Sequence, residues 1–276
     1  MKNSLSGKTV LIMGASSGIG KEIAKKFALE GADLILCARN FEKLKNTEIE
    51  IKKKISSIQR VHSFSVDISE ANQVKKLLQF TLEHFTNCDI IVNSSGIYGP
   101  KGLIEENKPE DWKKAIEINL LGPMILFHHF IPIFKKQNHG KIIQLSGGGA
   151  TNPMPYLSSY AASKAGVVRL IETLSKELKA YNIYANAVAP GPLNTEMLDE
   201  IINAGPDKVG KEFFNKSLMQ KQMNDNSFDN ITNLSLFLAT SKSDGISGKL
   251  ISALWDDWEK WPSNLSELNE SDLYTI

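Results

Sequence analysis

Residues 9–20 read TVLIMGASSGIG, a short apolar run that passes directly into a glycine-rich turn. The apolar and β-branched residues of the run predict a strand buried on both faces, and the amphipathic residues 20–30 predict a helix. Glycine is needed where backbone approaches a ligand closely, and the N–H groups at the start of a helix offer an anion site. Strand, glycine turn and helix in this order indicate a dinucleotide-binding unit, against the alternative of a merely structural turn.

The same alternation continues along the chain. Further short apolar runs occur at residues 33–37, 61–66, 89–92, 141–145, 183–188 and 249–253. Helical patterns lie between or beside them at residues 41–56, 70–85, 115–134, 158–180 and 230–240. This order predicts an α/β fold with a single doubly wound (Rossmann-type) parallel sheet of about seven strands and helices on both faces. Because no Pro/Gly/Ser linker divides the chain, residues 1–276 are expected to form one domain.

Two segments fall outside this alternation. Residues 195–225 are irregularly polar and apolar, which predicts a lid built of short helices. Residues 254–276 form an acidic C-terminal extension that carries Trp255, Trp258 and Trp261. Their spacing of three predicts that the indoles share one helix face, which packs on the lid, on its own subunit or on a neighbouring subunit.

Composition excludes several classes of function. The formal net charge of +1 gives no basic field, so neither nucleic acid nor a membrane is an expected partner. Cys37 and Cys88 are too few for a disulfide framework and are expected to be buried free thiols, which together with the absence of a signal-peptide core favours a cytoplasmic setting. Residues 115–134 are apolar but carry polar residues and two prolines, so they predict a long buried helix and not a membrane span. No metal site is expected, because the adjacent His128 and His129 cannot face one ion together.

Further motifs follow the glycine turn in order. They are Asn93-Ser94-Ser95-Gly96 after the fourth strand, Asn119, Ser146 at the end of the fifth strand, Tyr160-Ala161-Ala162-Ser163-Lys164, and Pro190-Gly191 with Thr195 and Met197. With the G-x-x-x-G-x-G turn they make residues 5–253 resemble the short-chain dehydrogenase/reductase family, which implies a nicotinamide-dependent oxidoreductase. Two departures concern local stability more than chemistry: Met13 stands at the family's usual Thr, and Asn-Ser-Ser-Gly replaces Asn-Asn-Ala-Gly.

The expected cofactor is NADP(H), with NAD(H) the less favoured alternative. An NAD-preferring fold carries an acidic residue at the end of the second strand, where this chain has Ala38. Arg39 follows, and its planar cation suits a 2′-phosphate, to which Ser17 could add a hydroxyl. The turn, Arg39 and the resemblance together give the cofactor-binding residues Gly14, Ser16, Ser17, Gly18, Ile19, Gly20, Arg39, Asp67, Ile68, Asn93, Gly96, Tyr160, Lys164, Pro190, Gly191 and Thr195.

Tyr160 is the expected general acid/base. An unperturbed tyrosine has a pKa near ~10, too high for an efficient base at neutral pH. Lys164 follows four residues later on the same helix face and is expected to lower that pKa. The resemblance further implies that Lys164 binds the nicotinamide ribose, that Ser146 bonds the substrate oxygen and that Asn119 completes a proton relay through water. Gly122 and Pro123 are expected to bend the helix after Asn119.

These residues favour an oxidoreductase that transfers a hydride between NADP(H) and a carbonyl or alcohol substrate. The alternatives are a 3-oxoacyl-thioester reductase and a catalytically idle dinucleotide-binding regulatory protein. The ending Ala253-Leu254-Trp255-Asp256-Asp257-Trp258 replaces the family's Val-Asp-Gly-Gly, which resembles some relatives from bacterial carbohydrate pathways and favours a sugar-like substrate. The apolar helices at 115–134 and 158–180 predict a homodimer or homotetramer.

Overall fold

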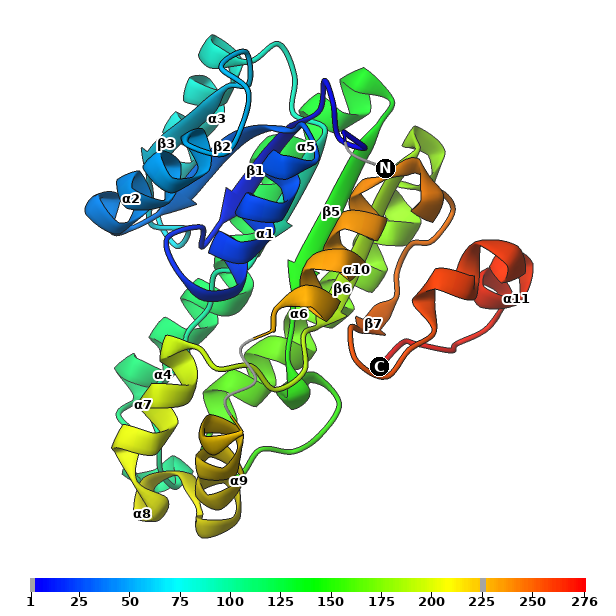
Figure 1. The fold of residues 1–276 in the computed structure, drawn as a ribbon. Coiled ribbons are helices and arrows are strands. Elements are labelled where there is room, and N and C mark those ends of the chain that lie inside the picture. Colours follow the sequence, from blue (N-terminus) through cyan, green and yellow to red (C-terminus); the bar gives the residue numbers. More distant parts are fainter. Residues whose placement is uncertain (1–2, 224–226) are drawn as a thin grey trace.

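The computed structural model describes residues 3–223 and 227–276 and contains one parallel sheet enclosed by helices (Figure 1). Its strand order is β3-β2-β1-β4-β5-β6-β7. The strands are β1 (Thr9–Met13), β2 (Asp33–Ala38), β3 (Val61–Ser65), β4 (Ile90–Asn93), β5 (Gly140–Leu145), β6 (Ile183–Ala189) and β7 (Leu250–Ser252). The predicted doubly wound α/β fold with seven strands is confirmed. The order reverses between β1 and β4, and a crevice at such a switch point is where parallel sheets of this kind bind ligands.

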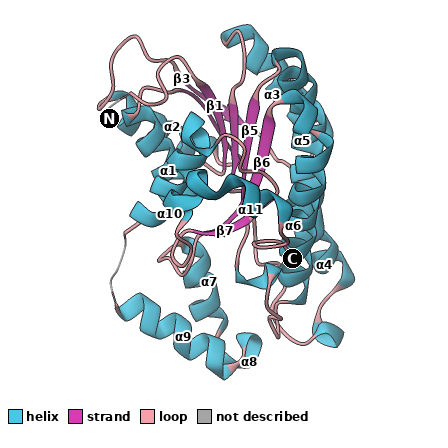
Figure 2. Cartoon of the chain, turned by 90° about the vertical axis from the view of Figure 1, so that its right-hand side faces the viewer, coloured by secondary structure: helices cyan, strands magenta, loops and turns pink. Residues whose placement is uncertain are grey.

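The helices form two layers, one on each face of the sheet. One face is covered by α1, α2 and α10, and the other by α3, α5 and α6 (Figure 2). The helices are α1 (Gly18–Leu29), α2 (Phe41–Lys52), α3 (Ala71–His84), α4 (Pro109–Ile116), α5 (Gly122–Gln137), α6 (Ser158–Glu177), α7 (Glu196–Ala204), α8 (Pro206–Val209), α9 (Lys211–Gln222), α10 (Asp229–Ala239) and α11 (Leu265–Glu270). Helix α2 ends at Lys52, four residues before the predicted end.

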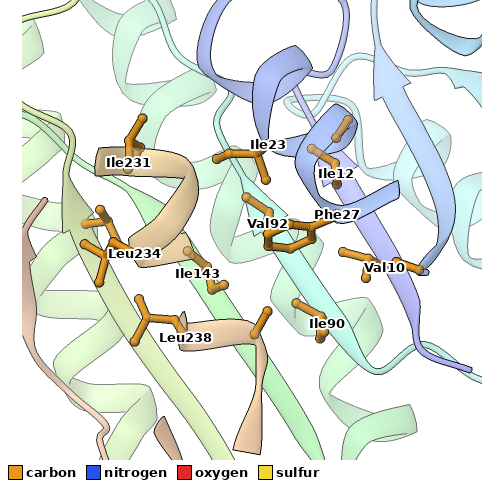
Figure 3. Packing of buried hydrophobic residues seen from close by; sticks show 14 of the residues in the cluster. Val10, Ile12, Ile23, Phe27, Ile90, Val92, Ile143, Ile231, Leu234 and Leu238 are labelled. Carbon is orange, nitrogen blue, oxygen red and sulfur yellow. The ribbon is translucent and has the colours of Figure 1, made fainter. Parts of the chain in front are cut away.

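Each layer encloses its own core, because alternate side chains of a strand point to opposite faces. Val10 and Ile12 of β1 belong to the core beneath α1 and α10, where Phe27 and Leu234 also lie (Figure 3). Leu11 and its neighbours on the other face pack against α3, α5 and α6. All five residues of β1 are buried, as its apolar and β-branched sequence predicts.

The predicted helix at residues 115–134 is part of a longer stretch, Pro109–Gln137, which is long and apolar enough to cross a membrane by length and composition (mean hydropathy 1.4). Phe127, Phe130 and Phe134 of this stretch are fully buried in the core beside α3, in agreement with a core helix. The stretch is not a regular α-helix, because residues Glu117–Leu121 form a π-helical segment between α4 and α5. The distortion thus precedes Gly122 and Pro123 and includes Asn119.

The C-terminal extension returns along β7, the edge strand of the sheet. The Leu250 N–H donates to the Tyr274 carbonyl at 2.7 Å. The Lys249 ammonium donates to the carbonyls of Ser271 (3.1 Å) and Leu273 (2.8 Å). Residues 271–274 therefore pair with the edge of the sheet on their own subunit.

The three tryptophans of the extension do not share one face, so that prediction is wrong. Trp258 packs on Phe237 of α10 with ring centroids 5.1 Å apart, and Trp261 packs on Tyr274 at 4.3 Å. Trp255 is 79% exposed, because it lies in a turn before the 3₁₀ helix Trp258–Asn264 and not on a continuous helix.

Candidate active site

The glycine turn connects β1 to α1 at the switch point of the sheet. A Cβ on Gly20 would lie 2.3 Å from the Gly14 carbonyl oxygen, so this position accepts only glycine without moving the backbone. Helix α1 begins at Gly18, and no side chain caps its first N–H groups. These uncapped donors and the positive end of the helix dipole form an anion site at the opening of the turn.

Ser94 compensates for one departure from the expected motif. Met13 cannot supply the hydroxyl of a threonine, but the Ser94 hydroxyl donates to the Met13 carbonyl at 2.6 Å. A Cβ on Gly20 would also lie 2.3 Å from this hydroxyl oxygen. The serine of Asn93-Ser94-Ser95-Gly96 therefore ties the end of β4 to the glycine turn.

A cavity of about 680 Å³ extends from the glycine turn along the carboxyl ends of β1 and β2; we call it the glycine-turn cavity. Eleven of the predicted cofactor residues line this cavity. Ten of them are Gly14, Ser16, Ser17, Gly18, Ile19, Gly20, Arg39, Asp67, Ile68 and Gly96. The eleventh is Thr195, which directly precedes α7. The Arg39 side chain is 58% exposed, and one of its terminal nitrogens lies 4.0 Å from the Asp67 carboxylate. Ala38, Lys43 and Glu196 also line this cavity, although the sequence did not indicate the last two as site residues.

A second cavity of about 600 Å³ contains Tyr160 and is called here the tyrosine cavity. Ser146, Lys164, Pro190 and Gly191 line it, as does the exposed indole of Trp255. The two cavities share the wall residues Ile19, Ser94, Gly96, Thr195 and Met197. One extended molecule can therefore reach from the glycine turn to Tyr160.

Ser146 follows β5 and presents an unusual polar atom. Its hydroxyl oxygen is buried and has no hydrogen-bond partner among the described residues, although it borders the tyrosine cavity. Leaving a buried hydroxyl unpaired costs free energy, so such a group in a cavity wall indicates a ligand partner.

Tyr160 lies in the first turn of α6 and is nearly fully buried. A Cβ on Gly147 would lie 2.4 Å from the Tyr160 hydroxyl, so glycine directly after Ser146 gives the phenol its place. The ring contacts Tyr98 at a centroid distance of 4.8 Å. Burial raises the pKa of Tyr160 well above its ordinary value, and the nearby Tyr98 raises it further.

The prediction that Lys164 lowers the tyrosine pKa is therefore wrong for this structure. Lys164 is on the same face of α6, but its ammonium lies over the Tyr160 ring, 5.6 Å from the centroid, and donates to the Leu145 carbonyl at 3.1 Å. Burial lowers the pKa of Lys164 itself to about 8. Desolvation by burial is the main cause of both shifts in pKa, and a spacing of four residues does not reveal burial.

Two predicted site residues, Asn119 and Asn93, lie on the wall of neither cavity. The amide of Asn119 accepts from the Ile97 N–H at 2.9 Å and donates to the Ile97 carbonyl and the Ser163 hydroxyl. Asn93 donates to Gln144 at 2.8 Å and is fully buried. Both side chains hold the loop after β4 and its neighbours in place.

The predicted lid consists of α7, α8 and α9, which lie together at the carboxyl end of the sheet (Figure 1). Ile201 and Val209 of the lid form a small apolar cluster with Leu157 and Tyr160. Residues 224 and 225 of the predicted lid lie outside the described residues. Within 3–223 and 227–276, no group of three or more His, Cys, Asp or Glu side chains is arranged to hold a metal ion.

The sheet and its glycine turn define a Rossmann-type α/β protein. A family model for short chain dehydrogenases matches residues 8–205. The 3-oxoacyl-[acyl-carrier-protein] reductase FabG of Thermotoga maritima is 31% identical over 247 residues, 90% of this chain and 96% of that protein. Glucose 1-dehydrogenase 2 of Bacillus subtilis is 31% identical over 197 residues, 71% of this chain and 76% of that protein. A solved short chain dehydrogenase from Shigella flexneri, complexed with NADP, superposes with a TM-score of 0.77 at 23% identity, covering 92% of this chain and 99% of that one.

The chain belongs to the short chain dehydrogenase family and is an oxidoreductase.

Proposed function

We propose that the chain transfers a hydride between NADP(H) and a carbonyl or alcohol substrate, with Tyr160 as general acid/base. The observation that carries the proposal is the unpartnered Ser146 hydroxyl, buried in the wall of the cavity that also holds Tyr160. That hydroxyl and the phenol are hydrogen-bond donors of the kind that a substrate oxygen requires. The continuity of this cavity with the glycine turn allows a dinucleotide to reach the same oxygen-binding place.

The cofactor supplies or accepts the hydride when it is bound. In reduction, Ser146 donates a hydrogen bond to the substrate oxygen, and Tyr160 donates the proton that this oxygen needs. A raised pKa keeps Tyr160 protonated at neutral pH, so the phenol can act as the acid in reduction. Lys164 is placed to bond the nicotinamide ribose, and Asn119 acts through the loop that it holds.

The residues at the far end of the glycine-turn cavity fit a 2′-phosphate. Ala38 presents no carboxylate at the end of β2, and the exposed Arg39 guanidinium lies in the wall beside it. The uncapped start of α1 suits the pyrophosphate. Among the relatives, the Shigella flexneri protein was solved with NADP.

Arg39→Ala is expected to weaken NADPH binding by about 1–3 kcal/mol, the range for losing charge-assisted hydrogen bonds, and to leave NADH binding nearly unchanged. Direct fluorescence titration of both cofactors checks this. Equal kcat/KM for NADPH and NADH in the unmodified chain contradicts the assignment of Arg39.

The relatives suggest two classes of substrate. The similarity to a 3-oxoacyl reductase supports thioester substrates, and the similarity to a glucose dehydrogenase supports sugars. A screen of simple ketones, sugars and 3-oxoacyl thioesters, followed by NADPH consumption, separates them. Turnover of none of these with NADPH, despite tight binding of the cofactor, assigns the substrate to another class of carbonyl compound.

Trp255→Ala is expected to raise KM about 2- to 10-fold with little change in kcat, because its indole borders the tyrosine cavity and offers stacking worth about 0.5–1.5 kcal/mol. Its high exposure means that folding does not depend on it. Trp258→Ala is the matched control, since Trp258 is buried and its loss should lower stability by about 3–5 kcal/mol. An unchanged KM for Trp255→Ala on the true substrate excludes the contact.

We propose two further properties, the compartment and the assembly of the chain. Cys37 and Cys88 are buried free thiols, which supports a reducing, cytoplasmic setting. Leu121, directly before α5, and Met124, in its first turn, are exposed apolar side chains, which supports a homodimer or homotetramer assembled through this region.

A further inference from the structure

An ion pair lies in the wall of the glycine-turn cavity. The Lys43 ammonium lies 2.7 Å from one carboxylate oxygen of Glu196, and the Ser17 hydroxyl lies 3.4 Å from the other. The three residues come from three segments: the glycine turn, the first turn of α2 and the first residue of α7 in the lid. All three line the cavity.

The N-cap of α2 holds the backbone of Lys43 in this position. The Asn40 side chain accepts from the Lys43 N–H at 2.9 Å and so caps the start of α2. Arg39 and Lys43, four residues apart in the chain, both line the cavity. Its wall therefore carries two cations, and the sequence pattern indicated only Arg39.

Glu196 is an anion that already occupies two of the donors in this wall. The hydrogen bond from Lys43 lowers the pKa of Glu196, so its carboxylate is ionised at neutral pH. A phosphate offers the same kind of acceptor oxygens with a larger charge. Both ends of the Lys43–Glu196 pair are more than half exposed, so a competing anion in solution can reach them.

We propose that the Glu196 carboxylate holds the place of the cofactor 2′-phosphate, and that Lys43 and Ser17 exchange it for that phosphate when NADP(H) binds. Lys43 is then a second phosphate-binding residue beside Arg39, and Glu196 is a competitor carried on the lid. The exchange releases the start of α7 from α2, which couples the lid to the phosphate that distinguishes NADP from NAD. This inference rests on the proposed preference for NADP(H).

The test is a double-mutant cycle on the full chain, with NADPH, NADH, adenosine 2′,5′-bisphosphate and 5′-AMP titrated by calorimetry. Lys43→Met is expected to weaken NADPH and the bisphosphate about 10-fold and to change NADH and 5′-AMP less than about 2-fold. Glu196→Gln is expected to tighten NADPH about 3- to 5-fold, the scale of an exposed ion pair. In the Lys43→Met background the gain from Glu196→Gln should shrink to less than about 2-fold, because only the Ser17 hydroxyl is left to exchange the carboxylate for the phosphate.

Two ion-paired residues outside the cavity provide matched controls. Lys45→Met removes a lysine on α2 that pairs with Glu48, and Glu212→Gln removes a carboxylate on α9 that pairs with Lys216. Both should leave the affinities for all four ligands unchanged. If they reproduce the effects of Lys43→Met and Glu196→Gln, the changes reflect net charge and the exchange is overturned.

Each remaining outcome has a distinct meaning. Unchanged NADPH affinity in Lys43→Met, or an equal gain from Glu196→Gln in both backgrounds, overturns the exchange while Arg39 and the cofactor preference stand. An equal loss of NADPH and NADH in Lys43→Met assigns Lys43 to the pyrophosphate and overturns the 2′-phosphate assignment. Equal affinity of the unmodified chain for NADPH and NADH refutes the proposed preference itself, and the exchange with it.

Discussion

Tyr160→Phe is expected to bind NADPH normally and to lose about 10²–10⁴-fold in turnover, the usual contribution of a general acid or base. The substitution removes only the hydroxyl, and the ring keeps its contact with Tyr98. Cofactor titration and steady-state rates on one substrate measure the two effects separately.

Tyr184→Phe provides the control, because Tyr184 lies on β6 beside Lys141 and lines neither cavity. It should retain full turnover. A Tyr160→Phe variant with near-normal rates on the true substrate would remove Tyr160 from the mechanism.

Lys164→Met is expected to abolish most activity and yet to stabilise the fold. The ammonium is buried, and burial lowers its pKa from 10.5 to about 8, which corresponds to about 3 kcal/mol of stability lost at neutral pH. Methionine fills similar space without a charge. The Leu145 carbonyl keeps a second donor, the Gln144 amide at 2.9 Å, after the ammonium is removed.

The pH dependence of unfolding tests this cause. Below pH 8 Lys164 is protonated in both the folded and the unfolded chain, so the full penalty applies and the variant should be more stable. Between pH 8 and 10.5 the folded chain holds fewer protons than the unfolded chain, so the stability contributed by Lys164 rises with pH and the difference from the variant should close.

Urea unfolding across this pH range measures the gap between the two proteins. Lys141→Met is the contrasting control. Burial also lowers the pKa of Lys141, but its ammonium bonds Thr240, Ser243 and Asp244, so its removal leaves these three partners without their donor and should destabilise the chain. A destabilised Lys164→Met variant at pH 7 contradicts the argument from burial.

The sheet and most of the site could be predicted because their determinants are local. Strands that are buried on both faces, such as β1, are typical of a parallel sheet. The residues of the glycine turn are contiguous in sequence, so the motif can be recognised without the fold. Ser146 directly follows β5, and Tyr160 and Lys164 lie in the first two turns of α6. Their order along the chain therefore predicts that all three lie at the carboxyl edge of the sheet.

Other features depend on long-range geometry. Lys43 and Glu196 are 153 residues apart, and nothing in either local pattern indicates their contact. The pKa of Tyr160 is set by burial against Tyr98 and the lid, which the spacing to Lys164 does not contain. Asn119 has the expected residue type, but its amide is used by Ile97 and Ser163.

The pairing of residues 271–274 with β7 has a consequence for self-association. An edge strand with free N–H and C=O groups is a template on which another chain can extend the sheet, and proteins avoid this by covering the edge. Here the Leu250 N–H is already bonded to Tyr274, and the Lys249 ammonium secures the covering segment at two carbonyls. The extension thus acts as a terminator of sheet growth, because it occupies the edge of β7 on which another chain would otherwise pair.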